Sequence, residues 1–230
     1  MEKPSIKEIR DKYRSSVGIW YTRIVCRRFS AYFSWFFVRT SITPNEISSL
    51  MILVGIIGGV FLAMPGYING LIGVLILHLF LILDYTDGEV ARIKRKFSSK
   101  GKFLDLIAND IVFISIFAGL IFRIFNGQNF IAIIAGFSAI VFFLLYKLFP
   151  LYAKELDEKL TGKYLNPIIF NTKIKSKAFQ IIEDLATPPH VIAIITLGVI
   201  FNIIPYILFS YAIFFFLYFF ASLLLRLNIR

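Results

Sequence analysis

The sequence contains a single cysteine, Cys26, and only two histidines among its 230 residues. One cysteine excludes an intramolecular disulfide and a cysteine-rich metal site. Charged residues are also scarce, at 17% of the chain, whereas 58% of the residues are hydrophobic and 26 of them are phenylalanine. A soluble protein of this length could not bury so much apolar surface, so the composition favours a polytopic membrane protein over a disordered or disulfide-stabilised chain.

Acidic residues are few relative to basic ones, with 14 Asp and Glu against 25 Lys and Arg, which gives a net charge of +11. An excess of this size is compatible with three kinds of partner: nucleic acid, an anionic membrane surface or a phosphorylated substrate. The positions of the cations along the chain distinguish between these partners.

Six apolar stretches predict an all-α integral membrane protein with six transmembrane helices, because most are long enough to cross about 30 Å of hydrocarbon. Their uninterrupted apolar runs favour helices, since the strands of a membrane barrel alternate in polarity. The first stretch begins too late in the chain for a cleaved signal peptide. The stretches cover about 47–64, 67–83, 103–125, 130–152, 190–206 and 207–227, of which the fifth is the weakest.

The basic residues fall on alternate connections between these stretches. Residues 1–45, 89–102, 147–177 and the C-terminus together hold 24 of the 25, and the exception is Arg123. The positive-inside rule therefore puts both termini and the two basic loops in the cytoplasm. The net charge then indicates orientation and attraction to anionic lipid, and no nucleic-acid partner is expected.

Residues 1–45 form a separate segment before the six-helix membrane domain of 46–230. The alternation of basic and aromatic residues between positions 5 and 38 favours an amphipathic helix at the cytoplasmic interface, with a solvated arm as the alternative. Thr43, Pro44 and Asn45, followed by Glu46, are typical of a helix start. The alternating residues are Lys7, Arg10, Lys12, Arg14, Arg23, Arg27 and Arg28 with Trp20, Tyr21, Ile24, Phe29, Phe33, Trp35 and Phe36.

Acidic residues beside membrane spans are energetically costly and indicate function. Asp84 and Asp87 lie three residues apart at the end of the second predicted span, and Asp105 lies near the start of the third. The basic loop between these spans would bring the three carboxylates together at the cytoplasmic boundary. A hard divalent cation, Mg²⁺ or Mn²⁺, would neutralise their repulsion and stay free to bind phosphate. The alternative to metal binding is that these acids form ion pairs with neighbouring basic residues. We favour this alternative for Glu89, whose expected partner is Lys94 or Arg95.

Other residues near these acids also suit a phosphorylated ligand. Gly88 and Gly101 leave room for a ligand to approach the backbone. Arg92 offers a planar set of donors for phosphate oxygens. Together with the carboxylates, these residues favour metal-assisted phosphoryl transfer.

The pattern Asp84-x2-Asp87-Gly88-x2-Ala91-Arg92-x8-Gly101-x3-Asp105 resembles the signature of the CDP-alcohol phosphotransferase family. The resemblance implies transfer of a substituted phosphate from a CDP-linked donor, commonly of the CDP-diacylglycerol type, to an alcohol, with release of CMP in phospholipid biosynthesis. It also implies two divalent ions, Mg or Mn, and a homodimer, since members of the family are commonly dimeric. By this resemblance the metal ligands are Asp84, Asp87 and Asp105, and the donor site is formed by Gly88, Ala91, Arg92, Gly101, Pro44 and Asn45.

One position departs from the family pattern. Members normally carry a fourth Asp four residues after the third, and this residue is thought to deprotonate the acceptor hydroxyl. The corresponding residue here is Asn109, whose amide can ligate metal but cannot act as an ionised base. Asp110 is no obvious substitute, because one residue turns a helix by about 100°.

Three interpretations of Asn109 remain open: an introduced Asp→Asn substitution, a branch of the family with another base, and a relative that binds CDP-lipid without catalysis. A membrane transporter is a further alternative. Transporters often contain inverted repeats and helices broken in mid-membrane. No internal repeat is evident here, and the acids cluster at one membrane face, so we favour the transferase.

Overall fold

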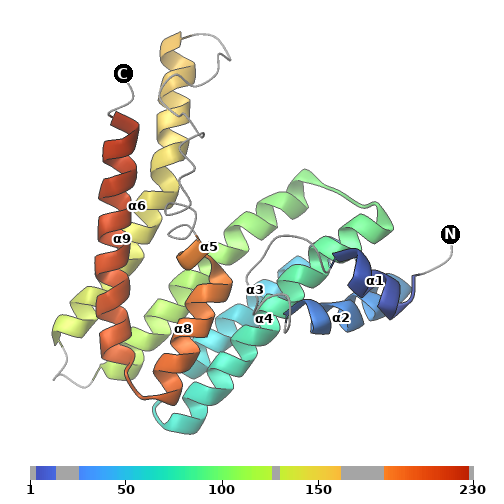
Figure 1. Cartoon of the computed structure of the whole chain (residues 1–230), viewed down its shortest axis with the longest axis horizontal. Coiled ribbons are helices and arrows are strands. Elements are labelled where there is room, and N and C mark those ends of the chain that lie inside the picture. Colours follow the sequence, from blue (N-terminus) through green and yellow to red (C-terminus); the bar gives the residue numbers. More distant parts are fainter. Residues whose placement is uncertain (1–3, 14–25, 126–129, 162–183, 228–230) are drawn as a thin grey trace. The chain divides into compact units, whose positions relative to one another are not determined.

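The computed structural model describes residues 4–13, 26–125, 130–161 and 184–227, and every regular element within these ranges is a helix. The predicted all-α class is therefore confirmed. Part of the proposed amphipathic segment, including Arg14, Trp20, Tyr21, Arg23 and Ile24, lies outside the described residues. The helices are α1 (Ile6–Tyr13), α2 (Arg27–Arg39), α3 (Pro44–Ala63), α4 (Tyr67–Lys94), α5 (Ser99–Ile124), α6 (Phe130–Thr161), α8 (Pro188–Ile200) and α9 (Ile204–Leu227) (Figure 1).

Helices α3, α4, α5, α6 and α9 contain apolar stretches long enough to cross a bilayer, which indicates a multi-pass integral membrane protein. The fifth predicted stretch instead forms α8, which has only 13 residues. A perpendicular crossing needs about 20 residues, so the predicted number of six spans is not confirmed.

The chain forms two compact units, residues 1–119 and 120–230. Helices α1 to α4 and most of α5 belong to the first unit, and α6, α8 and α9 belong to the second. The domain boundary expected near residue 45 stays a prediction.

In the first unit, α3 begins where the sequence indicated. The Thr43 hydroxyl accepts a hydrogen bond from the Glu46 backbone, and the Glu46 carboxylate accepts one from the Thr43 backbone at 2.7 Å. This capping box satisfies amide groups that a helix start leaves unpaired. Glycines then allow close helix packing, because a Cβ at Gly119 of α5 would overlap the Gly59 carbonyl of α3. The backbones of α3 and α5 therefore pack directly against each other.

In the second unit, α6 and α9 lie side by side (Figure 1) and contact each other through aromatic rings. The Tyr218 hydroxyl donates to the Tyr146 hydroxyl at 2.9 Å. Phe143 and Phe215 pack edge to face, with ring centroids 5.4 Å apart. Such aromatic pairs stabilise the contact between two helices beyond the effect of burying apolar surface.

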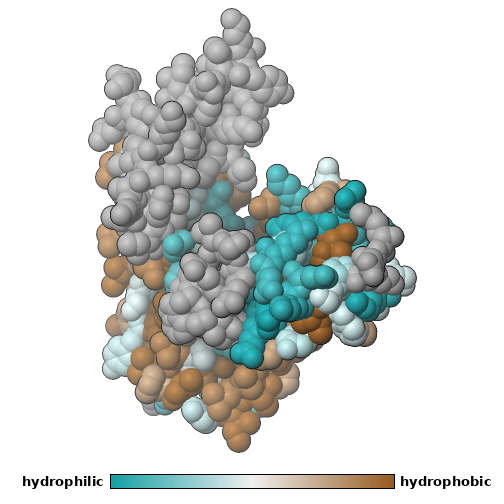
Figure 2. Space-filling view, turned by 45° about the vertical axis from the view of Figure 1, so that its right-hand side comes forward, coloured by the Kyte–Doolittle hydropathy of each residue, from teal (hydrophilic) through white to brown (hydrophobic). Residues whose placement is uncertain are grey.

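Large apolar side chains remain exposed along the predicted spans. In the face shown in Figure 2, hydrophobic residues form broad areas and hydrophilic residues gather in a separate zone. Continuous apolar surface of this extent is unusual for a soluble monomer and suits contact with lipid.

Candidate active site

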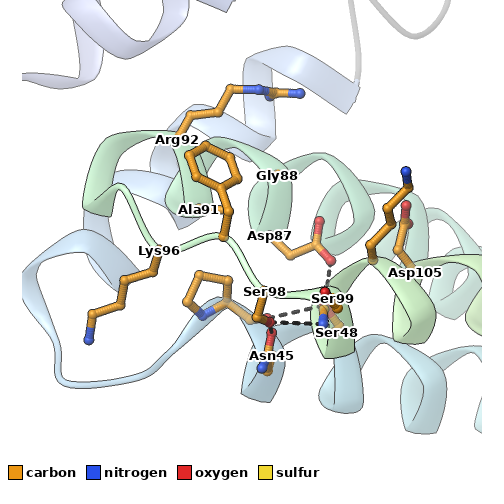
Figure 3. A pocket seen from close by; sticks show the side chains of 14 residues that line it. Asn45, Ser48, Asp87, Gly88, Ala91, Arg92, Lys96, Ser98, Ser99 and Asp105 are labelled. Carbon is orange, nitrogen blue, oxygen red and sulfur yellow. Dashed lines mark hydrogen bonds between the residues drawn. The ribbon is translucent and has the colours of Figure 1, made fainter.

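The first unit contains a cavity of about 600 Å³ where the starts of α3 and α5 approach the end of α4 (Figure 3). The cavity brings together residues from three separate parts of the sequence: 44 and 45; 87, 88, 91 and 92; and 101 and 105. The lining residues are Pro44, Asn45, Ser48, Asp87, Gly88, Ala91, Arg92, Lys96, Phe97, Ser98, Ser99, Gly101, Lys102 and Asp105.

Asn45 and Gly101 meet at one wall of the cavity. Ser98 precedes α5, and its hydroxyl accepts a hydrogen bond from the Gly101 backbone at 2.9 Å, as an N-cap residue does. The same hydroxyl donates to Asn45 Oδ1 at 3.1 Å. A Cβ at Gly101 would lie 2.5 Å from Asn45 Oδ1, so a larger residue at position 101 would force the Asn45 side chain to shift.

Asp87 is 7% exposed and its carboxylate accepts a hydrogen bond from the Ser48 hydroxyl at 2.6 Å. Ser48 also lies within hydrogen-bonding distance of the Pro44 carbonyl, at 3.1 Å. This contact orients one carboxylate oxygen towards α3 (Figure 3). Sequence reasoning missed Ser48, because its only local signal is a place one turn after the helix start at Pro44.

The three acids proposed as metal ligands lie within electrostatic range of one another. Asp87 and Asp105 line the cavity, whereas Asp84 is not among its lining residues. Within the described part of the chain, no three Asp, Glu, His or Cys side chains are close enough to form a metal cluster. The arrangement therefore supplies suitable donors without bringing all three to one point.

Asn109 lies one turn after Asp105, outside the lining of the cavity. Its amide nitrogen donates to the Asp105 backbone carbonyl at 3.1 Å. Its Oδ1 is buried and accepts no hydrogen bond. A buried acceptor without a donor is costly, and a hard cation is one group that would satisfy it. The carboxylates and this amide oxygen thus have the chemistry that Mg²⁺ or Mn²⁺ requires.

Gly88, Ala91 and Arg92 line the same cavity from α4. A Cβ at Gly88 would lie 3.5 Å from an Arg92 guanidinium nitrogen, so the guanidinium lies over the side of Gly88 that carries no side chain. In Figure 3 the Arg92 guanidinium does not point towards the Asp87 carboxylate. Arg92 is therefore at the edge of the cavity.

The connection from α4 to α5 adds lining residues that sequence reasoning did not select. Among them, Phe97 is 74% exposed and Lys96 brings positive charge to the cavity. Lys102, in the first turn of α5, adds a second cation. From the sequence, the residues before α5 were predicted only to form a basic loop. Their position at the cavity depends on how α4 and α5 pack, which the sequence does not show.

The expected pairing of Glu89 with Lys94 or Arg95 is wrong. Glu89 is only 2% exposed, and its two carboxylate oxygens accept hydrogen bonds from Ser30 at 3.0 Å and Ser34 at 2.6 Å. Lys94 instead donates to backbone carbonyls at the end of α2 and beyond, at positions 40 and 42. The physical reason is that Glu89 faces α2, where the serines supply short-range donors.

Helix α2 presents two different faces. Ser30, Ala31 and Ser34 are buried, whereas the opposite face exposes aromatic rings. This division agrees with the amphipathic helix expected from the sequence. The exposed rings are Phe29, Tyr32, Trp35 and Phe36.

Comparison with known proteins supports the chemistry of this cavity. The sequence model of the CDP-alcohol phosphatidyltransferase family matches residues 41–225, which contain every residue that lines the cavity. No curated protein matches the chain. Members of the family transfer phosphate from a CDP-alcohol to an acceptor and generally depend on a divalent metal. Because the match covers far more than half of the sequence, the chain belongs to the CDP-alcohol phosphatidyltransferase family.

Proposed function

We propose that this protein transfers a substituted phosphate from a CDP-diacylglycerol-type donor to an alcohol and thereby makes a phospholipid. The observation that carries the proposal is the cavity where Asp87, Gly88, Ala91, Gly101 and Asp105 meet, although the last pair lies at least ten positions after the first group along the chain. Glycines and basic residues around carboxylates suit a metal-bound pyrophosphate.

In the proposed reaction, the acceptor hydroxyl oxygen attacks the phosphorus that carries the non-nucleotide group. A new P–O bond forms, the P–O bond to the bridging oxygen breaks, and CMP leaves with that oxygen. The hydroxyl proton passes to solvent water. Arg92 and Lys102 would bind phosphate oxygens, and Gly88 and Gly101 would let the nucleotide approach the backbone. Asn45 and Ser98 would hold the wall opposite α4.

Asp84, Asp87 and Asp105 would hold the divalent ions. The ions would neutralise charge on the phosphate oxygens. The Ser48 hydroxyl would fix the Asp87 carboxylate through its 2.6 Å hydrogen bond. The buried, unbonded Oδ1 of Asn109 is an additional oxygen ligand of the right type.

Asn109 supports a second candidate function, that of a relative which binds CDP-lipid without turnover. The amide cannot take the acceptor proton as an ionised base. The two candidates differ in one measurement, since the binding relative would show metal-dependent CDP binding and release no CMP.

We also propose that the cavity opens towards the cytoplasm. It is lined by the end of α4, the loop that follows and the first turn of α5. Basic residues are concentrated there, and such charge favours the cytoplasmic side. They are Arg92, Lys94, Arg95, Lys96 and Lys102. The exposed aromatic face of α2 would lie in the interface between the membrane and the cytoplasm. Reactivity of single cysteines placed at Lys96 and Tyr67 towards an impermeant reagent in oriented vesicles tests this orientation.

CMP release from the purified protein, with Mg²⁺ or Mn²⁺ and a panel of donors and alcohols, tests the function directly. Asp87→Ala should abolish release, because it removes a buried carboxylate from the cavity. Asp184→Ala is the matched control, since this exposed carboxylate lies in the second unit. Unchanged release in Asp87→Ala would disprove the assignment of the site. Light scattering of the same preparation measures whether the protein forms the homodimer that the family commonly forms.

A further inference from the structure

The two N-terminal helices lie before the region that matches the family, which starts at residue 41. They nevertheless contact the end of α4 that lines the cavity. Ile9, Tyr13 and Ala31 form a small core together with Ile93 of α4. This core places the last residue of α1, Tyr13, beside Arg92.

Arg92 contacts Tyr13 directly. The guanidinium carbon lies 5.6 Å from the centre of the Tyr13 ring, within the range of a cation–π interaction. The guanidinium also lies 3.5 Å from the position that a Cβ of residue 88 would occupy, which is open because this residue is glycine. Burial raises the pKa of the Tyr13 hydroxyl above its usual value of 10, so the ring that faces Arg92 is neutral at physiological pH.

Tyr13 is itself held in place by α2. Arg27, the first residue of α2, donates from its guanidinium to the Tyr13 carbonyl at 2.7 Å. Two further residues of α2, Ser30 and Ser34, donate to Glu89 of α4. The contacts therefore form a closed path from α4 through α2 and Tyr13 back to α4.

A second, smaller cavity of about 190 Å³ separates part of α1 from α4. Arg92 lines this cavity as well as the larger one, and Tyr13 lines only the smaller. Without the ring, the arginine side chain would have space to move away from the larger cavity. Lys12 also approaches the Tyr13 ring, at 5.7 Å.

We propose that Tyr13 is a positioning residue that holds the Arg92 guanidinium at the edge of the donor cavity. The inference rests on the proposed function, because it takes Arg92 as a donor phosphate ligand. It assigns part of the site to a helix outside the family-matched region. The chemistry requires an aromatic ring at position 13 and does not require its hydroxyl.

The test compares Tyr13→Leu with Tyr13→Phe. Losing the ring should raise the KM for the CDP-linked donor by about 2- to 30-fold, with little change in kcat. This factor corresponds to the binding free energy of a cation–π contact. Tyr13→Phe should restore the KM to within about twofold. Tyr67→Leu, at the opposite end of α4 and exposed, is the control for loss of a tyrosine.

A double-mutant cycle separates positioning from simple packing. In an Arg92→Ala background, Tyr13→Leu should produce no further rise in KM, because the group that it positions is gone. Independent, additive effects would overturn the proposal. If Tyr13→Leu does not fold, stepwise fluorination of a phenylalanine at position 13 provides the second test, since fluorine weakens the attraction of the ring for a cation. A KM that is insensitive to fluorination would also overturn it.

Binding of CDP with Mg²⁺ distinguishes failure of this inference from failure of the proposed function. If the wild-type protein binds CDP but releases no CMP, the transferase proposal fails, and the Tyr13 variants are compared by their Kd for CDP. If the wild-type protein turns over and the Tyr13 and Arg92 effects are additive, only the positioning role fails. Absence of both binding and turnover would overturn both.

Discussion

Replacing Asn109 by aspartate should make the protein turn over faster and make its stability depend on metal. In the wild type the Asn109 amide donates to the Asp105 carbonyl at 3.1 Å. A carboxylate cannot donate this bond and would face the carbonyl oxygen instead. The substitution also places a carboxylate one helical turn from Asp105.

The size of the effect follows from the one-turn separation of positions 105 and 109. Side chains four residues apart on a helix lie about 6 Å from each other. At an effective dielectric constant of about 20, two negative charges at that distance repel by roughly 3 kcal/mol. A bound divalent ion would remove this penalty. A carboxylate that acts as general base contributes about 10²- to 10⁴-fold in rate.

The assay is thermal unfolding in detergent micelles with EDTA or Mg²⁺, together with kcat for CMP release. In a chain of this size 1 kcal/mol shifts the Tm by roughly 2–4 °C. The variant should therefore unfold about 6–12 °C lower than the wild type in EDTA, and the difference should close with Mg²⁺.

Asn69→Asp is the matched control. The Asn69 amide donates to the Pro65 carbonyl at 2.7 Å, also four residues earlier, at the end of α4 away from the cavity. This variant loses the same type of bond and should gain neither turnover nor metal dependence. An Asn109→Asp protein with unchanged kcat and a Tm deficit that Mg²⁺ does not reduce would refute the placement of residue 109 at the metal.

Three further predictions concern single contacts. Ser34→Ala should cost about 1.5–3 kcal/mol of unfolding free energy, because it removes a donor from the buried carboxylate of Glu89; an unchanged Tm would contradict this. Gly101→Ala should raise the donor KM roughly 5- to 100-fold, because its Cβ would press on Asn45 Oδ1; a wild-type KM would argue against the cavity as the donor site. Gly66→Ala should lower stability by about 1–3 kcal/mol, since the residue has a φ of +96°, and steady-state kinetics should show no change in KM.

The local features of this protein could be predicted from the sequence because they depend on short-range rules. Long apolar runs must form helices in lipid, and five of the six predicted spans have helices of sufficient length. The start of α3 at Pro44 follows from the Thr43 capping box. The fifth predicted span is not confirmed, since α8 has only 13 residues.

The candidate site could be predicted only in part. The spacing of Asp87, Gly88 and Ala91 fixes them on one face of a helix, and all three line the cavity. Ser48 could not be selected, because nothing near it in the sequence indicates that it faces an acid 39 residues away. The family roles of the site residues stay predictions until the metal and donor experiments are done.

The sequence by itself determined the membrane class, the position of the helices and the resemblance that names the chemistry. The tertiary structure alone decided which partners the charged groups have. Glu89 has basic residues nearby in the sequence but bonds to Ser30 and Ser34, and Arg92 lies over the ring of Tyr13. A buried charge takes the donors that helix packing brings within hydrogen-bonding distance, and neighbours along the chain do not reveal that packing.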